Sequence, residues 1–190
     1  MKERLQQIIQ ESINTKQQII NNDVLLEKIN NCVSLITAAF KAGNKVLFCG
    51  NGGSAADAQH LAAEFSGRFY KDRKALPSEA LHCNSSYLTA VANDYSYDVI
   101  YSRLLEGIGN KGDVIVGIST SGNSKNIINA FDVAKKNGIT TIAFTGETGG
   151  KMKDCCDVLI NIPSNNTPRI QESHIMIGHI ICELVEENLF

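Results

Sequence analysis

The sequence lacks the features that mark several large classes of protein. Its 190 residues carry a formal net charge of -2, so it has no basic excess of the kind that binds nucleic acid. No apolar run approaches the ~20 residues that a membrane-spanning helix needs, and the first residues, MKERLQQIIQ, are too polar for a signal peptide. We therefore expect no nucleic-acid partner, no membrane attachment and a cytoplasmic location.

Disulfide frameworks and repeats are also missing. The six cysteines include no Cys-x-x-Cys pair, and two of them, Cys155 and Cys156, are adjacent, which favours reduced thiols. We find no internal repeat and no low-complexity segment. At 190 residues and 43% hydrophobic, the chain is long enough for one well-buried core and short for two, so we predict a single domain over residues 1–190.

What the sequence does contain is an alternation of strand-like and helix-like patterns. Five short apolar runs at 46–49, 79–83, 113–118, 140–144 and 157–162 read as strands. The run at 113–118 is almost continuously apolar, as in a parallel strand that is buried on both faces. Helical patterns follow from Ser54 and over 87–94, 97–108, 125–137 and 167–190. This order predicts an α/β fold, a doubly wound five-stranded parallel sheet flanked by helices, over residues 44–190.

Two helical patterns precede the first strand. The first has an apolar stripe made of Leu5, Ile8, Ile9 and Ile13. The second runs from about Asp23 to Gly43 and places five apolar residues inward: Leu26, Ile29, Val33, Ile36 and Phe40. Because one sheet offers little surface to both helices, we expect residues 1–43 to pack against another copy of the chain. Simple cover of the chain's own core is the alternative.

The stretch from Lys45 to Arg68 organises the rest. A strand ends in Gly50-Asn51-Gly52-Gly53, and Ser54 with Asp57 forms a capping-box pattern at a helix start. A strand, a glycine turn and a helix N-terminus form a site for an anion, most often phosphate. The glycines also match a dinucleotide fingerprint, but the next strand ends in Cys83 and Asn84 without the required acid, which weakens that interpretation.

A second loop of this kind follows the central strand. Ser119-Thr120-Ser121-Gly122-Asn123-Ser124 offers four hydroxyl groups just before a helix. A serine-rich turn alone is usually only a turn, but two such loops in one small domain predict a phosphorylated ligand. The charged run from Phe69 to Lys74, by contrast, reads as a solvated loop.

Acid/base or metal-binding residues lie on two helices. His60 and Glu64 project from one helix face, as a functional pair or merely as a surface hydrogen bond. Because Glu64 follows the first loop on the same helix, a ligand's carbon chain could pass its carboxylate. The last helix carries Gln171, His174 and His179. Gln171 and His179 lie about 12 Å apart along a regular helix, so they reach one ion only through a non-helical start or shared subunits, and spacing leaves His174 as a rival.

Four segments in order resemble the phosphoheptose isomerases, a family of the sugar isomerase (SIS) fold group: GNGGSAADAQHLAAEFSGR, ANDYSYD, GISTSGNS and TPRIQESHIMIGHIICELVE. The resemblance covers essentially the whole chain. It implies a homotetramer that converts sedoheptulose 7-phosphate to D-glycero-D-manno-heptose 7-phosphate through an enediol. That reaction begins bacterial heptose nucleotide biosynthesis, for lipopolysaccharide, capsule or another glycan.

The resemblance also assigns residues. It implies Glu64 as the catalytic base with His179 as its partner, and one zinc ion per subunit held by His60, Glu64, Gln171 and His179. The substrate would contact twelve residues: Asn51, Gly52, Gly53, Ser54, Glu64, Asn93, Asp94, Ser119, Thr120, Ser121, Ser124 and Gln171.

Two other functional classes are alternatives to an enzyme. Non-catalytic scaffolds that associate with the bacterial replication initiator lack the acid and the histidine found here as Glu64 and His179, and this chain has both. A sugar-phosphate-sensing domain would need the two loops but neither of these residues. Isomerases of shorter phosphosugars remain an alternative within the enzyme class.

Overall fold

The computed structural model describes residues 1–190, and its centre is a five-stranded sheet. The strands are β1 (Val46–Gly50), β2 (Ser78–Ala80), β3 (Val114–Ser119), β4 (Thr140–Thr145) and β5 (Val158–Asn161). All neighbouring pairs are parallel, in the order β2-β1-β3-β4-β5. The predicted sheet is confirmed, although β2 ends at Ala80 and not at Cys83, because this edge strand has only one partner.

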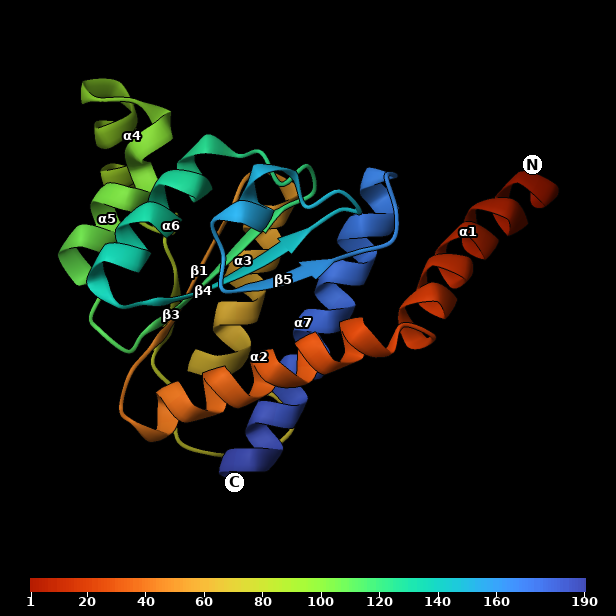
Figure 1. The fold of residues 1–190 in the computed structure, drawn as a ribbon, viewed down its shortest axis with the longest axis horizontal. Helices are drawn as coiled ribbons and strands as arrows, with labels where there is room; N and C mark the ends of the chain where they lie inside the picture. The colour runs from red at the N-terminus through yellow and green to blue at the C-terminus, as the bar shows by residue number, and fades with distance from the viewer.

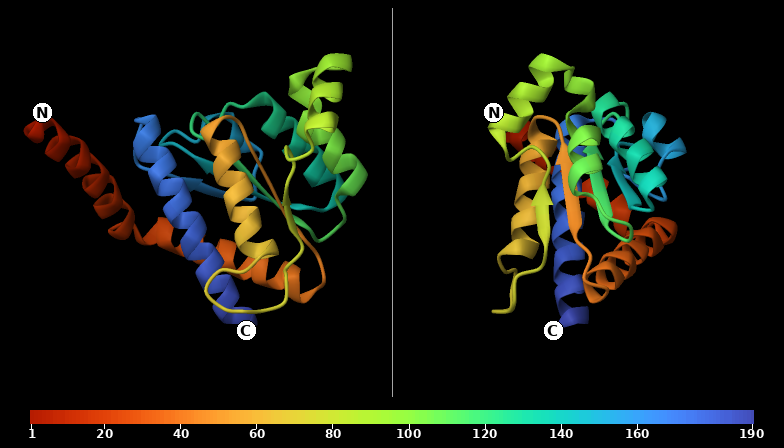
Figure 2. Two further views of the ribbon diagram at one scale, coloured as in Figure 1. Left: turned by 180° about the vertical axis from the view of Figure 1, so that it is seen from behind. Right: turned by 90° about the vertical axis from the view of Figure 1, so that its left-hand side faces the viewer.

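Helices cover both faces of the sheet (Figures 1 and 2). One face carries α2 (Asp23–Lys41), α3 (Gly53–Ser66) and α7 (Thr167–Leu189), and the other carries α4 (Ser85–Asp94), α5 (Ile100–Ile108) and α6 (Lys125–Asn137). Short 3-10 turns, η1 (Tyr97–Val99) and η2 (Gly150–Asp154), lie between α4 and α5 and between β4 and β5. No helix is long and apolar enough to cross a membrane.

Alternation along the strands builds two cores. Phe48 and Val116 point into the cluster with α2, α3 and α7, whereas Leu47 and Ile115 point into the cluster with α4, α5 and α6. This is what a doubly wound sheet requires, because successive side chains of a strand face opposite sides.

The two N-terminal helices behave differently. The second, α2, packs within this chain, and the inward residue of its first turn is Leu25, which is buried, while Leu26 is exposed. The expectation that its stripe faces another copy is therefore wrong for α2, which finds α7 and the sheet as partners. The first, α1 (Lys2–Ile20), extends from the body (Figure 1) and leaves Leu5, Ile9 and Ile13 at least half exposed.

Candidate functional site

The strand order locates the site. In an open sheet with order 2-1-3-4-5, the chain turns in opposite directions from β1 and β3, and ligands bind at the carboxyl ends of these two strands. The two predicted phosphate loops follow β1 and β3, which pair directly, with Gly50 opposite Ile118. Sequence positions nearly 70 residues apart are thus brought to one crevice.

The first loop depends on a glycine for its turn between β1 and α3. Gly52 has φ of 58°, a conformation that side chains disfavour, and α3 begins at Gly53 with Gly52 as its N-cap. The predicted capping box is wrong, because the helix starts before Ser54 and no side chain caps it. Asp57 Oδ2 is buried without a hydrogen-bond partner. Burial raises the pKa of Asp57, although His60 and His179 act in the opposite direction.

The second loop gathers three hydroxyl groups, which we call the hydroxyl cluster: Ser119, Ser121 and Ser124. The Oγ atoms of Ser119 and Ser124 are 2.8 Å apart, and those of Ser119 and Ser121 are 3.5 Å apart. Ser124 is the N-cap residue of α6, yet its hydroxyl does not cap the helix. Hydroxyl donors and a helix N-terminus therefore converge at one place, as an anion site requires. Thr120 and Ser121 also line a polar pocket of about 290 Å³ with Thr148 and Asn165.

Two residues that sequence reasoning missed hold Asn51. Its side-chain amide exchanges two hydrogen bonds with the buried Asn126, at 3.0 and 2.9 Å, and Tyr97 donates its hydroxyl to Asn51 Oδ1 at 3.0 Å. Nothing in the sequence singles out Asn126, whose partner is 75 residues away. Tyr97 lies in the ANDYSYD segment and could have been examined there.

The remaining predicted residues lie around these loops. Asn93 and Asp94 are exposed at the end of α4 and bond to each other at 2.9 Å. Gln171 lies on α7 with its amide against Gly53, since a Cβ there would come within 2.5 Å of Nε2. Because α7 is helical from Thr167, a non-helical start does not bring Gln171 to His179.

Three side chains form what we call the histidine–glutamate cluster: His60, Glu64 and His179. His60 Nε2 is 2.9 Å from His179 Nε2 and 3.1 Å from Glu64 Oε1. The close approach of α3 and α7 depends on Gly178, because a Cβ there would collide with Leu61. Gly178 and Leu61 each adjoin a histidine in sequence, so this contact brings the two rings together, with centroids 5.1 Å apart and planes inclined at 64° (the helices are side by side in Figure 2).

The cluster fits a metal ion. All three residues offer a ligand atom within 4.8 Å of the others. Ligands of a tetrahedral zinc ion, at ~2.0–2.1 Å from the metal, lie about 3.3 Å apart, and imidazole with carboxylate is a zinc-type set. Two imidazole Nε2 atoms facing each other either share one proton or both offer lone pairs to a cation.

His174 is not part of the site. It is fully buried, its Nε2 is 3.0 Å from the carbonyl oxygen of Thr145, and its ring packs on Phe144. Burial lowers its pKa to about 4, against the raising effect of the Thr145 carbonyl. His174 is therefore a neutral core residue, and the choice of His179 follows from its contact with His60.

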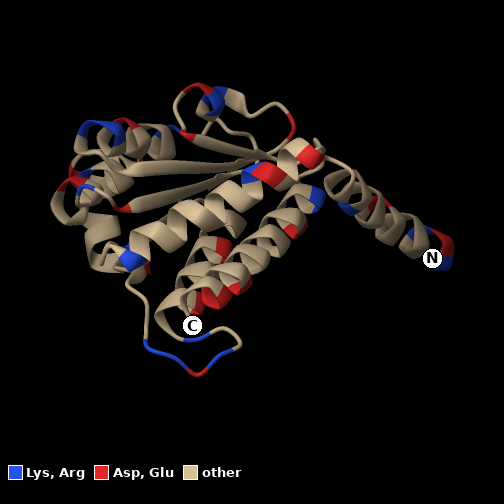
Figure 3. Cartoon of the chain, turned by 60° about the horizontal axis from the view of Figure 1, so that its bottom comes forward, with Lys and Arg blue, Asp and Glu red and all other residues tan.

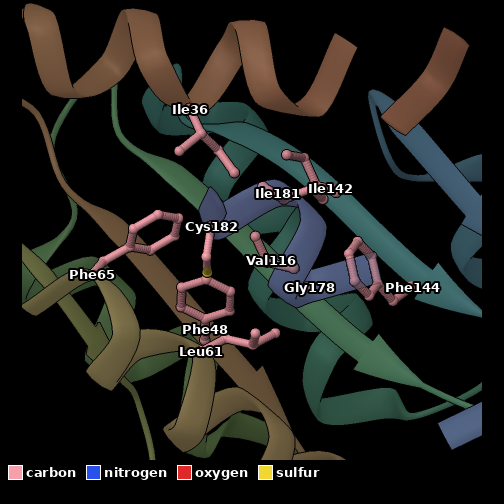
Figure 4. A pocket seen from close by; sticks show the side chains of 10 residues that line it. All are labelled: Ile36, Phe48, Leu61, Phe65, Val116, Ile142, Phe144, Gly178, Ile181 and Cys182. Atoms are coloured by element: carbon pink, nitrogen blue, oxygen red, sulfur yellow. The ribbon is translucent and has the colours of Figure 1, made fainter. Parts of the chain in front are cut away.

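An apolar cavity between α2, α3, α7 and the sheet is not a ligand site (Figure 4). Its volume is about 10 Å³, and it is lined by side chains such as Phe48, Leu61, Phe65 and Cys182. A space of this size without polar groups does not hold even an ordered water.

Known proteins share both the sequence and the fold. The SIS domain profile matches residues 7–146. The phosphoheptose isomerase of Clostridium acetobutylicum is 53% identical over 100% of this chain and 97% of its own length. Solved phosphoheptose isomerases from Neisseria gonorrhoeae (TM-score 0.92, 41% identity, 98% of each chain) and Francisella tularensis (0.93, 31%, 97% of each) superpose over nearly all of it. The chain belongs to the phosphoheptose isomerase family of SIS-domain proteins.

Proposed function

We propose that the enzyme converts sedoheptulose 7-phosphate to D-glycero-D-manno-heptose 7-phosphate, the first step of bacterial heptose nucleotide biosynthesis. The observation that carries the proposal is the histidine–glutamate cluster, in which a carboxylate and two imidazoles face each other within 4.8 Å. A phosphate-binding protein that only senses sugars needs the hydroxyl cluster alone. A non-catalytic scaffold needs neither, so both alternatives are disfavoured.

Phosphate binding is assigned to the two loops. Ser119, Thr120, Ser121 and Ser124 donate hydroxyl groups at the N-terminus of α6, and Ser54 does so at the N-terminus of α3. Asn51, fixed by Asn126 and Tyr97, orients the sugar hydroxyls together with Asn93 and Asp94, and Gly52, Gly53 and Gln171 complete the binding surface. A fixed amide costs less entropy on binding than a free one.

Proton transfer is assigned to the histidine–glutamate cluster. The Glu64 carboxylate removes a proton from C1 of the 2-ketose, giving an enediol, and returns one to C2. The His179 imidazole moves a proton from O1 to O2, so the carbonyl passes from C2 to C1 with no net gain or loss of electrons. The same atoms are present in substrate and product, as an isomerisation requires.

Distance within one chain indicates that two subunits share each site. From Ser54 to Glu64, α3 rises about 15 Å. A heptose phosphate spans at most about 10 Å from C1 to phosphorus, since three extended single bonds cover roughly 3.6 Å. A sugar whose phosphate is held at Ser54 therefore falls short of the Glu64 carboxylate of the same chain, contrary to the expectation that its carbon chain passes that carboxylate. We assign Glu64 and His179 of a neighbouring subunit to it.

The surface supports association between copies. Leu5, Ile9 and Ile13 are 50% exposed or more on α1. A groove of about 370 Å³ between α1, α2 and α7 continues this surface, lined by side chains including Ile20, Leu26 and Ile180. Exposed apolar surface of this extent marks an interaction site. We propose a homotetramer, and light scattering at micromolar concentration tests it, since a monomeric mass contradicts it.

Zinc is the proposed cofactor, one ion per subunit, held by His60, Glu64 and His179. Gln171 of a neighbouring subunit is the fourth proposed ligand, because Gln171 of the same chain lies two helical turns from His179. When bound, such an ion polarises the substrate carbonyl. Elemental analysis of protein purified without chelators should give near-stoichiometric zinc. A metal-free, fully active enzyme would contradict the assignment.

The location proposed for the enzyme is the cytoplasm. All six cysteines are free thiols, which fits a reducing compartment. The product then serves lipopolysaccharide, capsule or another glycan.

The test of the reaction is incubation with sedoheptulose 7-phosphate in deuterated water, followed by NMR. We expect an aldose that carries solvent deuterium at C2 unless one group returns the proton without exchange. A five-carbon ketose phosphate serves as comparator. If the enzyme turns it over faster than sedoheptulose 7-phosphate, the proposed substrate is wrong and the pentose phosphate takes its place. Co-refolding Glu64→Gln chains with Ser121→Ala/Ser124→Ala chains tests the shared site, because mixed oligomers regain kcat/KM only if one site draws on two chains.

A further inference from the structure

A buried ion pair fixes the segment between α3 and β2, which the sequence presents as a solvated charged loop. Arg73 Nε lies 2.7 Å from Glu186 Oε1, and both side chains are only 2% exposed. Glu186 is on the last turns of α7, and Figure 3 shows the charged loop beside the C-terminal end of the chain. The charge-run prediction is thus wrong for Arg73, because its partner is 113 residues away in sequence.

The Glu186 carboxylate anchors the loop backbone as well as Arg73. Its oxygens accept the N–H groups of Phe69, Tyr70 and Lys71 at 3.2, 2.8 and 2.8 Å. Burial acts to raise the pKa of Glu186, but the hydrogen bonds that the carboxylate accepts outweigh burial and lower it. Each oxygen accepts two hydrogen bonds, so the carboxylate ties the loop backbone to α7.

The Arg73 guanidinium holds the other end. It donates to the carbonyl oxygens of Glu64 at 2.8 Å and Phe65 at 2.9 Å, and to those of Gly67 and Lys74 at 3.3 and 3.2 Å. The carbonyls of Glu64 and Phe65 are among those that a helix leaves unpaired at its C-terminus. Arg73 therefore fixes the turn of α3 from which the Glu64 side chain projects.

The same loop reaches His179. The Phe69 ring lies with its centroid 5.9 Å from that of His179, at 32° between planes. Glu186 is seven residues after His179, which is two turns along the same helix. The Glu186 carboxylate therefore holds the loop that bears Phe69, and with it the distance between the Phe69 ring and the His179 imidazole.

We propose that Glu186 and Arg73 are positioning residues for the isomerisation. Arg73 holds the turn of α3 that bears Glu64, and Glu186 holds the loop whose Phe69 ring contacts His179, so together they set the position of the Glu64 carboxylate relative to the His179 imidazole. The inference rests on the proposed function, because it gives the two side chains their catalytic meaning. Groups that orient reacting side chains are worth much in rate, since a displacement of about 1 Å can cost roughly 100-fold.

The test compares Glu186→Gln with a matched control, Asp113→Asn. Asp113 is also a buried carboxylate that accepts two backbone N–H groups and pairs with a cation, Lys45 Nζ at 2.6 Å, but it precedes the central strand β3 and its partners, Lys45 and Asn110, belong to neither α3, α7 nor the loop that bears Phe69. Both variants should lower Tm. Only Glu186→Gln should lower kcat roughly 10- to 100-fold, with KM changed less than about twofold.

A second variant guards against misfolding. Phe69→Leu keeps the backbone N–H that Glu186 accepts and removes only the ring that contacts His179. It should lower kcat roughly 10-fold at near wild-type Tm. Wild-type kcat in Phe69→Leu, or equal kcat in Glu186→Gln and Asp113→Asn, overturns the inference. A wild-type protein that does not turn over sedoheptulose 7-phosphate instead overturns the proposed function.

Discussion

His174 and His179 lie on one helix and differ in every respect that bears on chemistry. His174 is fully buried against β4, and its Nε2 faces the Thr145 carbonyl. His179 is partly exposed, and its Nε2 faces His60 on α3. Five residues turn a helix by about 140° beyond one full turn, so the two rings meet different elements. The neighbouring element decides what a histidine can do.

The surroundings of His174 and His179 also differ in whether they allow the ring to exchange a proton. With Nε2–H donated to a carbonyl, His174 leaves Nδ1 as a bare buried lone pair without a partner, and burial lowers its pKa to about 4. Such a ring stays neutral and exchanges no proton near neutral pH. His179 has solvent on one side and a carboxylate and a second imidazole on the other, which is the environment of a proton-transfer group.

The largest expected effect tests this contrast directly. Glu64→Gln and His179→Gln should each lower kcat at least about 100-fold, because a positioned acid or base contributes ~10²–10⁴-fold. The double variant should be little worse than the poorer single one, since residues that act as a unit are not additive. Rates come from NMR of aldose formation, with zinc content measured in parallel.

His174→Gln is the control for that series, and its kcat should stay close to wild type. Loss of kcat in His174→Gln equal to that in His179→Gln would erase the distinction between the two histidines. Full activity of Glu64→Gln with zinc still bound would falsify the assignment of the base.

Much of this architecture could be predicted from the sequence, because local patterns determine it. Apolar runs followed by glycine- or serine-rich turns predicted the five strands and both loops, and the i, i+4 spacing placed His60 beside Glu64. Contacts between distant segments could not be predicted. Spacing alone left His174 and His179 equivalent, since helical phase has meaning only once α3 and β4 are in place. Arg73 was predicted to be solvated for the same reason, because its partner Glu186 is 113 residues away in the sequence.

The capping box failed on a finer point. Ser54 and Asp57 have the right spacing, but Gly52 accepts positive φ and starts α3 earlier. Backbone freedom at one glycine outweighs a side-chain motif that contributes on the order of 1 kcal/mol.

An effect of intermediate size, on KM, is expected for substitutions in the hydroxyl cluster. Ser121→Ala and Ser124→Ala each remove one hydroxyl from the hydroxyl cluster, and a hydrogen bond to a charged group contributes ~1.5–3 kcal/mol. KM should rise roughly 10- to 100-fold with kcat little changed. Ser34→Ala, which removes an exposed hydroxyl on α2, is the matched control. Unchanged KM in both loop variants would contradict phosphate binding at the hydroxyl cluster, and the loop from Gly50 to Ser54 would then be the site to test.

The smallest effect concerns His174 and stability. Its folded pKa of about 4 lies below its ordinary value of 6.5, so the unfolded chain binds more protons between these values, and stability falls as pH falls through that window. From pH 7 to pH 5 the loss should be about 2 kcal/mol. The buried Glu186, whose pKa is lowered, adds its loss only below about 4.5, and His82, whose pKa burial also lowers, adds to the loss in the same direction.

Urea unfolding at the two pH values, at one protein concentration, measures this loss. His174→Gln retains an amide donor for the Thr145 carbonyl and cannot titrate, so the dependence on pH should flatten by most of that amount. His179→Gln is the matched substitution on the same helix outside the core, and the pH dependence that His174 causes should remain in it. If the two variants flatten the curve equally, burial does not separate the histidines, and the contrast between the two faces of α7 fails as an explanation of their roles.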